Sequence, residues 1–147
     1  MNTDADPFDL QRFVDAQDPV YAQVSAELAA AAKTSHWMWF VFPQLRALGR
    51  SATALHYGLA SPAEAETYWR HPVLGPRLEA CSTQVARHAG SRSAVQIFGA
   101  IDAMKLRSCM TLFEAVVAAQ PTPAPVFAKV LDAFYAGERD PLTLAQL

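Results

Sequence analysis

The class of fold depends on one hydrophobic segment, Thr34-Ser35-His36-Trp37-Met38-Trp39-Phe40-Val41-Phe42-Pro43. Its aromatic and β-branched side chains would suit a buried strand. The sequence contains no second convincing strand to pair with it, and a lone strand is not a stable unit. Ser35 can cap a helix, and Pro43 can end one. We therefore predict a short buried helix here and an all-α fold.

Helix-start signals recur along the rest of the chain. They are Asp6-Pro7, Asp18-Pro19, Ser61-Pro62-Ala63-Glu64, Ser93-Ala94-Val95-Gln96, Asp102 and Asp140-Pro141. Each places a capping side chain before apolar residues, and several add a proline, which suits the first helical position. The prolines of segment 120–125 end the long helix expected after Asp102. We predict a single compact domain over residues 1–147, with about six to eight helices, some of them short.

Composition excludes several classes of function. Of the 147 residues, 52% are hydrophobic and 18% are charged, with a formal net charge of −2. Lys and Arg are scattered singly, so the sequence predicts no surface for nucleic acid or for an anionic membrane. The strongly hydrophobic run Trp37–Phe42 is far shorter than the roughly 20 residues that span a bilayer. The sequence does not predict the oligomeric state.

Two cysteines, Cys81 and Cys109, are too few for a disulfide framework or a zinc site. The four histidines lie far apart in the sequence, so no metal site is predicted, and no motif indicates a particular cofactor. Because the sequence has no secretory signal pattern, we expect a cytoplasmic protein.

Residues suited to ligand binding are densest at His36, Trp37 and Trp39, followed by Gln44. Buried aromatic residues usually supply core area, so a central core helix is one interpretation. The other is that Trp37 or Trp39 forms a wall of a pocket with His36 and Gln44 at its rim. Buried indole and imidazole nitrogens need hydrogen-bond partners, and a ligand can supply them.

Two further groups carry charge. Asp102 and Lys105 are three residues apart, which predicts a cap and a surface ion pair, or a lysine that binds an anion in a cleft. The Asp102 carboxylate would oppose a phosphate at this helix start. His71 and Arg77 flank a Pro/Gly bend. Arg77 fits the dipole of a helix start poorly, so we expect it to have an anionic partner, first of all a carboxylate of the protein.

Two functions follow as alternatives. In the first, these residues converge on one cleft for a nucleotide-like or anionic metabolite, with Trp37 or Trp39 stacking on a ring and Arg77 or Lys105 pairing with the anion. If catalysis takes place there, His36 or His71 would be the acid or base, and Asp102 would orient or activate water. In the second, the same residues are structural and the chain is a protein–protein interaction or scaffold module.

Several segments also carry a resemblance to a known family. They are Arg12-Phe13, Ala16-Gln17, Lys33 to Gln44, His71 to Leu78, Phe98-Gly99 with Asp102, Lys105-Leu106 with Ser108, and Thr111-Leu112-Phe113. The chain resembles the bacterial and fungal "domain of unknown function 1810" family over about residues 8–143. The resemblance implies a mainly α-helical fold and supplies no biochemical role. Relatives commonly have serine in place of Cys109, which argues against a nucleophilic cysteine there.

Overall fold

Ten α-helices and one turn of 3₁₀ helix follow one another along residues 6–147, the part of the chain that the computed structural model describes. They are α1 (Gln11–Gln17), α2 (Tyr21–Ala29), α3 (Met38–Val41), η2 (Arg46–Leu48), α4 (Ala52–His56), α5 (Pro62–Arg70), α6 (Leu74–Ala86), α7 (Ala94–Phe98), α8 (Ala100–Ala118), α9 (Val126–Phe134) and α10 (Pro141–Leu144). In the described residues β-pairing is limited to one bridge, between Leu45 and Leu59. The predicted all-α fold is confirmed, and segment 34–43 contains the short helix α3.

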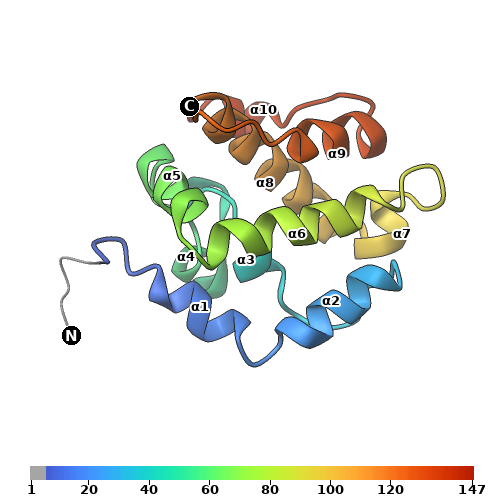
Figure 1. The fold of residues 1–147 in the computed structure, drawn as a ribbon, viewed down its shortest axis with the longest axis horizontal. Helices are drawn as coiled ribbons and strands as arrows, with labels where there is room; N and C mark the ends of the chain where they lie inside the picture. Colours follow the sequence, from blue (N-terminus) through green and yellow to red (C-terminus); the bar gives the residue numbers. More distant parts are fainter. Residues whose placement is uncertain (1–5) are drawn as a thin grey trace.

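The longest helix, α8, organises the C-terminal half of the molecule. It packs against α5, α7, α9 and α10, while α6 packs against α2, α5 and α9. Figure 1 shows α6 crossing the middle of the molecule, with α1 and α2 on one side and α8 to α10 on the other. None of the helices in residues 6–147 is long and apolar enough to cross a membrane.

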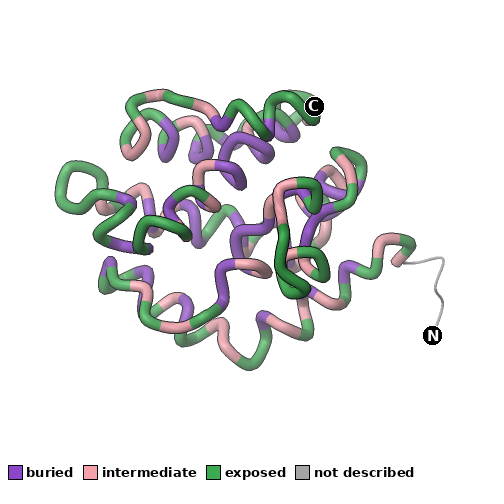
Figure 2. The backbone as a smooth tube through the Cα atoms, turned by 180° about the vertical axis from the view of Figure 1, so that it is seen from behind, coloured by how far each residue is buried: buried purple, intermediate pink, exposed green. Residues whose placement is uncertain are grey.

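Aromatic contacts connect the helices at the core. Tyr68 on α5 lies between Phe13 of α1 and Phe113 of α8, with ring centroids 5.1 Å and 5.6 Å away. A second cluster joins segment 34–43 to α7, because the Phe42 ring lies 6.2 Å from Trp37 and 6.0 Å from Phe98. Each such pair adds about 1 kcal/mol beyond the burial of its area. Figure 2 shows burial along the middle of the molecule and exposure in the loops.

Caps whose partners are close in sequence form as predicted. Ser93 and Gln96 make both halves of a capping box at the start of α7. The Ser61 hydroxyl accepts a hydrogen bond from the backbone N–H of Glu64, and Asp140 accepts one from that of Thr143. At these helix starts, residues within one turn satisfy N–H groups that the helix itself leaves free.

Four predicted caps differ in the structure. The N-cap of α1 is Leu10, and the Asp6 carboxylate accepts from the N–H groups of Leu10 and Gln11. The other three predicted caps are wrong because those side chains bind partners elsewhere. The N-cap of α2 is Val20, since the Asp18 carboxylate pairs with Arg77 at 2.9 Å. Ser35 does not cap α3, because its hydroxyl donates to Glu27. Asp102 lies inside the first turn of α8, whose N-cap is Gly99.

The capping box predicted at Ser61 is half formed. The Glu64 side chain accepts from the backbone N–H of Ala60 and from Arg12, both at 2.8 Å, and not from the Ser61 N–H. A buried carboxylate is best satisfied by a charged donor, and Arg12 supplies one from the N-terminal helix.

Candidate functional site

An open hollow of about 470 Å³ lies between segment 33–39 and the start of α8, and we call it the α3–α8 cleft. Its lining residues are Lys33, His36, Met38, Trp39, Phe98, Gly99, Ala100, Ile101, Asp102 and Lys105. The volume falls within the range of small-molecule sites. The cleft brings together four residues that the sequence singled out, namely His36, Trp39, Asp102 and Lys105.

Two lysines surround one carboxylate in this cleft. Lys33 Nζ lies 2.8 Å from one oxygen of Asp102, and Lys105 Nζ lies 3.6 Å from the other. Only 7% of the Lys33 side chain is exposed, so this ion pair is largely removed from water. With two cations for one anion, the described lining carries a net positive charge. The two lysines therefore offset the repulsion that Asp102 alone would exert on an anion.

Lys105 also lies over an aromatic ring. Its ammonium nitrogen is 5.0 Å from the centroid of the half-buried Trp39 ring, within the range of a cation–π contact. A lysine ammonium is a compact charge on a flexible stem. It can therefore leave the ring to meet an anion while a planar group takes its place over Trp39.

The start of α8 adds backbone donors to the cleft. Gly99 connects α7 to α8 with φ at +82°, a value that glycine adopts without strain. As N-cap, Gly99 has no side chain to accept from the first turn of α8, and no other side chain caps this end. Ala100 and Ile101, the first two residues of the helix, line the cleft. Their N–H groups carry the partial positive charge of a helix N-terminus.

Trp37 supports the cleft from behind and does not line it. It is 1% exposed, and its indole nitrogen donates to the Glu27 carboxylate at 3.0 Å. The same carboxylate accepts from the backbone N–H groups of Thr34 and Ser35, at 2.8 Å and 3.1 Å. Burial acts to raise the pKa of Glu27, but these donors and the Ser35 hydroxyl outweigh it and hold the pKa at about 2. An ionised Glu27 thus anchors the loop that carries the cleft wall.

Gln44 lies beside the cleft, in a smaller recess. That recess has a volume of about 10 Å³, room for about one water molecule. Trp39 and Lys105 line both hollows and so stand between them. Gln44 is therefore close to the cleft without lining it.

His71 and Arg77 lie away from the cleft. The Nδ1 atom of His71 accepts from the N–H groups of Val73 and Leu74, at 3.1 Å and 3.2 Å, at the start of α6. Burial lowers the pKa of His71, against the opposing charge of Asp6. Arg77 pairs with Asp18 at 2.9 Å, so it has the protein carboxylate that the sequence led us to expect.

The two thiols are poorly suited to nucleophilic chemistry. Cys109 lies on α8 with no exposed surface, and burial raises its pKa well above the ordinary value. Burial also raises the pKa of Cys81, to about 11. Neither thiol is a thiolate near neutral pH. Residues 6–147 contain no group of three or more His, Cys, Asp or Glu side chains placed to hold a metal ion.

Lys33 is the one charged residue of the described cleft lining that the sequence analysis did not select as a site residue. It follows the alanine run of α2, and its partner Asp102 is far away in the sequence, so no local pattern marked it. Its one signal was its position at the start of the segment from Lys33 to Gln44, which carries the family resemblance.

Comparison with known proteins agrees with that resemblance. The family described as "Protein of unknown function (DUF1810)" matches residues 7–147, nearly the whole chain. The chain belongs to the DUF1810 family. This DUF1810 chain is also similar to the conserved hypothetical protein Rv1873 from Mycobacterium tuberculosis, whose crystal structure is solved. The two are 48% identical with a TM-score of 0.91, over 97% of this chain and 98% of the other. No curated protein matches the chain.

Proposed function

We propose that the α3–α8 cleft binds a small molecule with a planar ring and an anionic group, of the nucleoside monophosphate class. The observation that carries this proposal is the pairing of Lys105 with Trp39 on one open hollow. An aromatic face and a mobile cation side by side suit a ligand that offers both a ring and a negative charge.

Each part of such a ligand has a counterpart in the lining. The ring would lie on Trp39, with Met38 and Phe98 as apolar neighbours. The phosphate would take Lys105 as its main cation, because Lys33 is already held by Asp102. The N–H groups at the start of α8 would add donors to the same anion. His36, which is exposed at the cleft, would contact the ligand and is the candidate acid or base if the ligand is turned over.

Calorimetric titration with three probes tests this proposal. AMP has both ring and phosphate, adenosine lacks the phosphate, and ribose 5-phosphate lacks the ring. We expect AMP to bind at least about tenfold more tightly than either fragment, because only AMP uses both contacts. Lys105→Ala should reduce the affinity for AMP to that for adenosine. Trp39→Leu should reduce the affinity for AMP to that for ribose 5-phosphate.

The matched controls lie outside the cleft. Lys129→Ala removes an exposed lysine of α9, and Trp69→Leu removes the other half-buried tryptophan. Both variants should bind AMP as the unaltered chain does. If AMP does not bind, or if the controls weaken it as much as the cleft variants, the proposal fails. The interaction-module alternative would then stand, with the exposed Val95, Ile101 and Met104 as its surface.

The charge balance of the cleft gives a separate prediction. Asp102→Asn removes the one carboxylate among the described lining residues and frees both lysines for the ligand. We expect AMP to bind about fivefold more tightly, with a steeper dependence on salt. The melting temperature should fall, because the poorly exposed Lys33 loses its partner. Weaker AMP binding by a folded Asp102→Asn would contradict the cationic role of the lysines.

We also propose that the protein is cytoplasmic. Cys81 and Cys109 are both free and buried, which is compatible with the reducing cytoplasm that the sequence led us to expect.

A further inference from the structure

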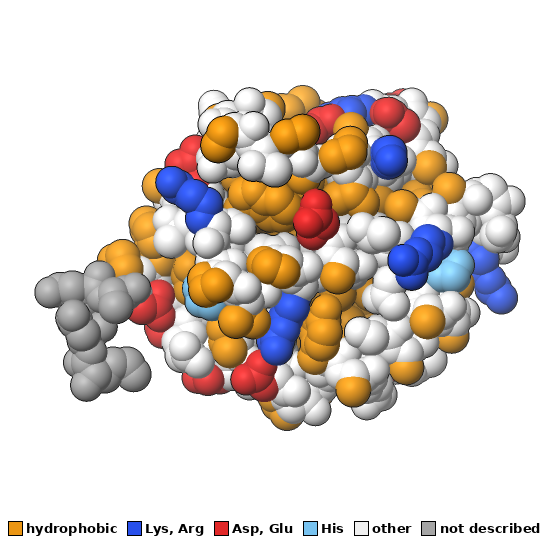
Figure 3. All heavy atoms as spheres, in the orientation of Figure 1, with side chains coloured by type: hydrophobic (Ala, Val, Ile, Leu, Met, Phe, Trp, Pro, Cys, Tyr) orange, Lys and Arg blue, Asp and Glu red, His pale blue; other side chains and the backbone are white. Residues whose placement is uncertain are grey.

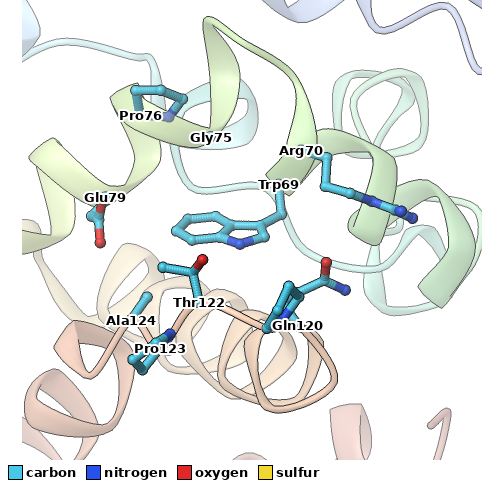
Figure 4. Close-up of a pocket in the computed structure, with 10 residues that line it drawn as sticks. Trp69, Arg70, Gly75, Pro76, Glu79, Gln120, Thr122, Pro123 and Ala124 are labelled. Atoms are coloured by element: carbon cyan, nitrogen blue, oxygen red, sulfur yellow. The ribbon is translucent and has the colours of Figure 1, made fainter.

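A groove separate from the α3–α8 cleft lies between the α5–α6 corner and segment 120–124. Its volume is about 370 Å³, and it shares no lining residue with the cleft. Figure 4 shows the indole of Trp69 across the middle of this groove, with Glu79 toward one end and Gln120 toward the other. The Arg70 side chain extends away from the ring. We call this hollow the Trp69 groove.

The Trp69 ring is held firmly in place. Its centroid lies 5.4 Å from that of Phe127 in an edge-to-face contact. Gly75 packs so closely that a Cβ atom there would be 2.0 Å from the Trp69 carbonyl oxygen. Pro76 and the prolines of segment 120–124 add rigid apolar walls. Figure 3 shows hydrophobic side chains gathered between α6 and the C-terminal helices. A binding surface that is already rigid loses little entropy when it is occupied.

The polar groups of the groove offer oxygen atoms without protein partners. Within residues 6–147, the Glu79 carboxylate makes no ion pair or hydrogen bond. The side chains of Gln120 and Thr122 make none there either. Arg70 also lines the groove, but its side chain extends away from the indole ring (Figure 4) and lies 3.9 Å from Glu66, so it makes no ion pair with Glu79. The groove thus combines one aromatic ring, one unpaired carboxylate and two further acceptors.

We infer that the Trp69 groove binds a guanidinium group, from an arginine side chain or a small guanidino compound. A guanidinium is planar, so it stacks on an indole while its N–H groups donate in the plane of the group. Glu79, Gln120 and Thr122 supply the acceptors, and the carboxylate balances the charge. A quaternary ammonium could use the ring but has no N–H for these oxygens. An anion would be repelled by Glu79.

Binding can be followed through the indole N–H signals of the three tryptophans in ¹H–¹⁵N spectra. The probe is Nα-acetyl-arginine amide, and its match is Nα-acetyl-citrulline amide, which has nearly the same shape without the charge. We expect the arginine probe to shift the Trp69 signal saturably and the citrulline probe to shift it little. Glu79→Gln should lower the affinity for the arginine probe about fivefold. Asp15→Asn, which changes an exposed acid of α1 away from the groove, should leave that affinity unchanged.

Because Glu79 is exposed, its substitution leaves the core intact. Equal binding of the citrulline probe, or an unchanged affinity in Glu79→Gln, would overturn the assignment. So would tighter binding of choline than of the arginine probe. An arginine-containing peptide that binds more tightly than the single residue would point to a protein partner. Equal affinities would point to a small guanidino compound.

Discussion

Replacing Glu27 by Gln is expected to lower the free energy of unfolding by roughly 3 kcal/mol. The carboxylate accepts hydrogen bonds from the Gln23 amide, the Thr34 and Ser35 backbone, the Ser35 hydroxyl and the Trp37 indole. A glutamine has one oxygen and would turn an NH₂ group toward several of these donors. Buried donors left without an acceptor are strongly unfavourable. Urea denaturation at pH 7 measures the difference.

The same substitution changes how stability depends on pH. The pKa of Glu27 is about 2 in the folded chain, against an ordinary value of 4.5. Its contribution is therefore fully present above about pH 4.5 and is lost as the pH falls toward 2. The stability difference between the unaltered chain and Glu27→Gln should shrink over that interval. Glu66→Gln, at an exposed ion pair, should stay within about 0.5 kcal/mol of the unaltered chain. A constant difference from pH 7 to pH 2 would contradict this account of Glu27.

Gly75→Ala is expected to destabilise the fold by about 3 kcal/mol, at the upper end for overpacking. The added Cβ would lie 2.0 Å from the backbone oxygen of Trp69. This oxygen belongs to the backbone and cannot rotate away as a side chain can. The end of α5 and the start of α6 must therefore separate. Trp69 would move with them, and the arginine probe should lose affinity for the Trp69 groove.

Gly90→Ala is the matched comparison. Gly90 has φ at +82°, and a Cβ atom there would meet nothing within 4 Å. Its substitution costs only the backbone strain, about 1 kcal/mol. Comparing the free energies of unfolding of the two variants therefore separates the steric clash of an added Cβ atom from the strain of a positive φ. If Gly75→Ala is as stable as Gly90→Ala, the α5–α6 corner can move apart to accept the added Cβ atom at little cost, and this explanation is wrong.

The sequence predicted the parts of the fold that depend on near neighbours. Segment 34–43 could be assigned as helix because it had no strand partner anywhere in the chain. The caps at Ser61, Ser93 and Asp140 bind groups within three residues, so their patterns were sufficient. His71 gave a signal of the same kind that was missed. Its ring accepts from N–H groups two and three residues onward, as a capping side chain does.

The other features of the fold and of the cleft depend on contacts between residues that no local sequence pattern connects. Asp18 and Asp102 look like caps in sequence, but they pair with Arg77 of α6 and with Lys33 of the loop after α2. Trp37 and Trp39 are two residues apart in one short segment. Glu27 of α2 draws Trp37 into the core, while Trp39 stays half-buried at the cleft. No local pattern distinguishes the two rings, because the difference comes from a carboxylate ten residues earlier that looks like an ordinary surface residue of α2.

We propose that the α3–α8 cleft binds a planar ring that carries an anion. The most direct test is to titrate the ¹⁵N-labelled chain with AMP and to follow the three indole N–H signals. We predict a saturable shift of the Trp39 signal, which is identified by its absence from the spectrum of Trp39→Leu. The Trp37 and Trp69 signals should move little. A Trp39 signal that stays in place at millimolar AMP, or a response confined to Trp69, would contradict it.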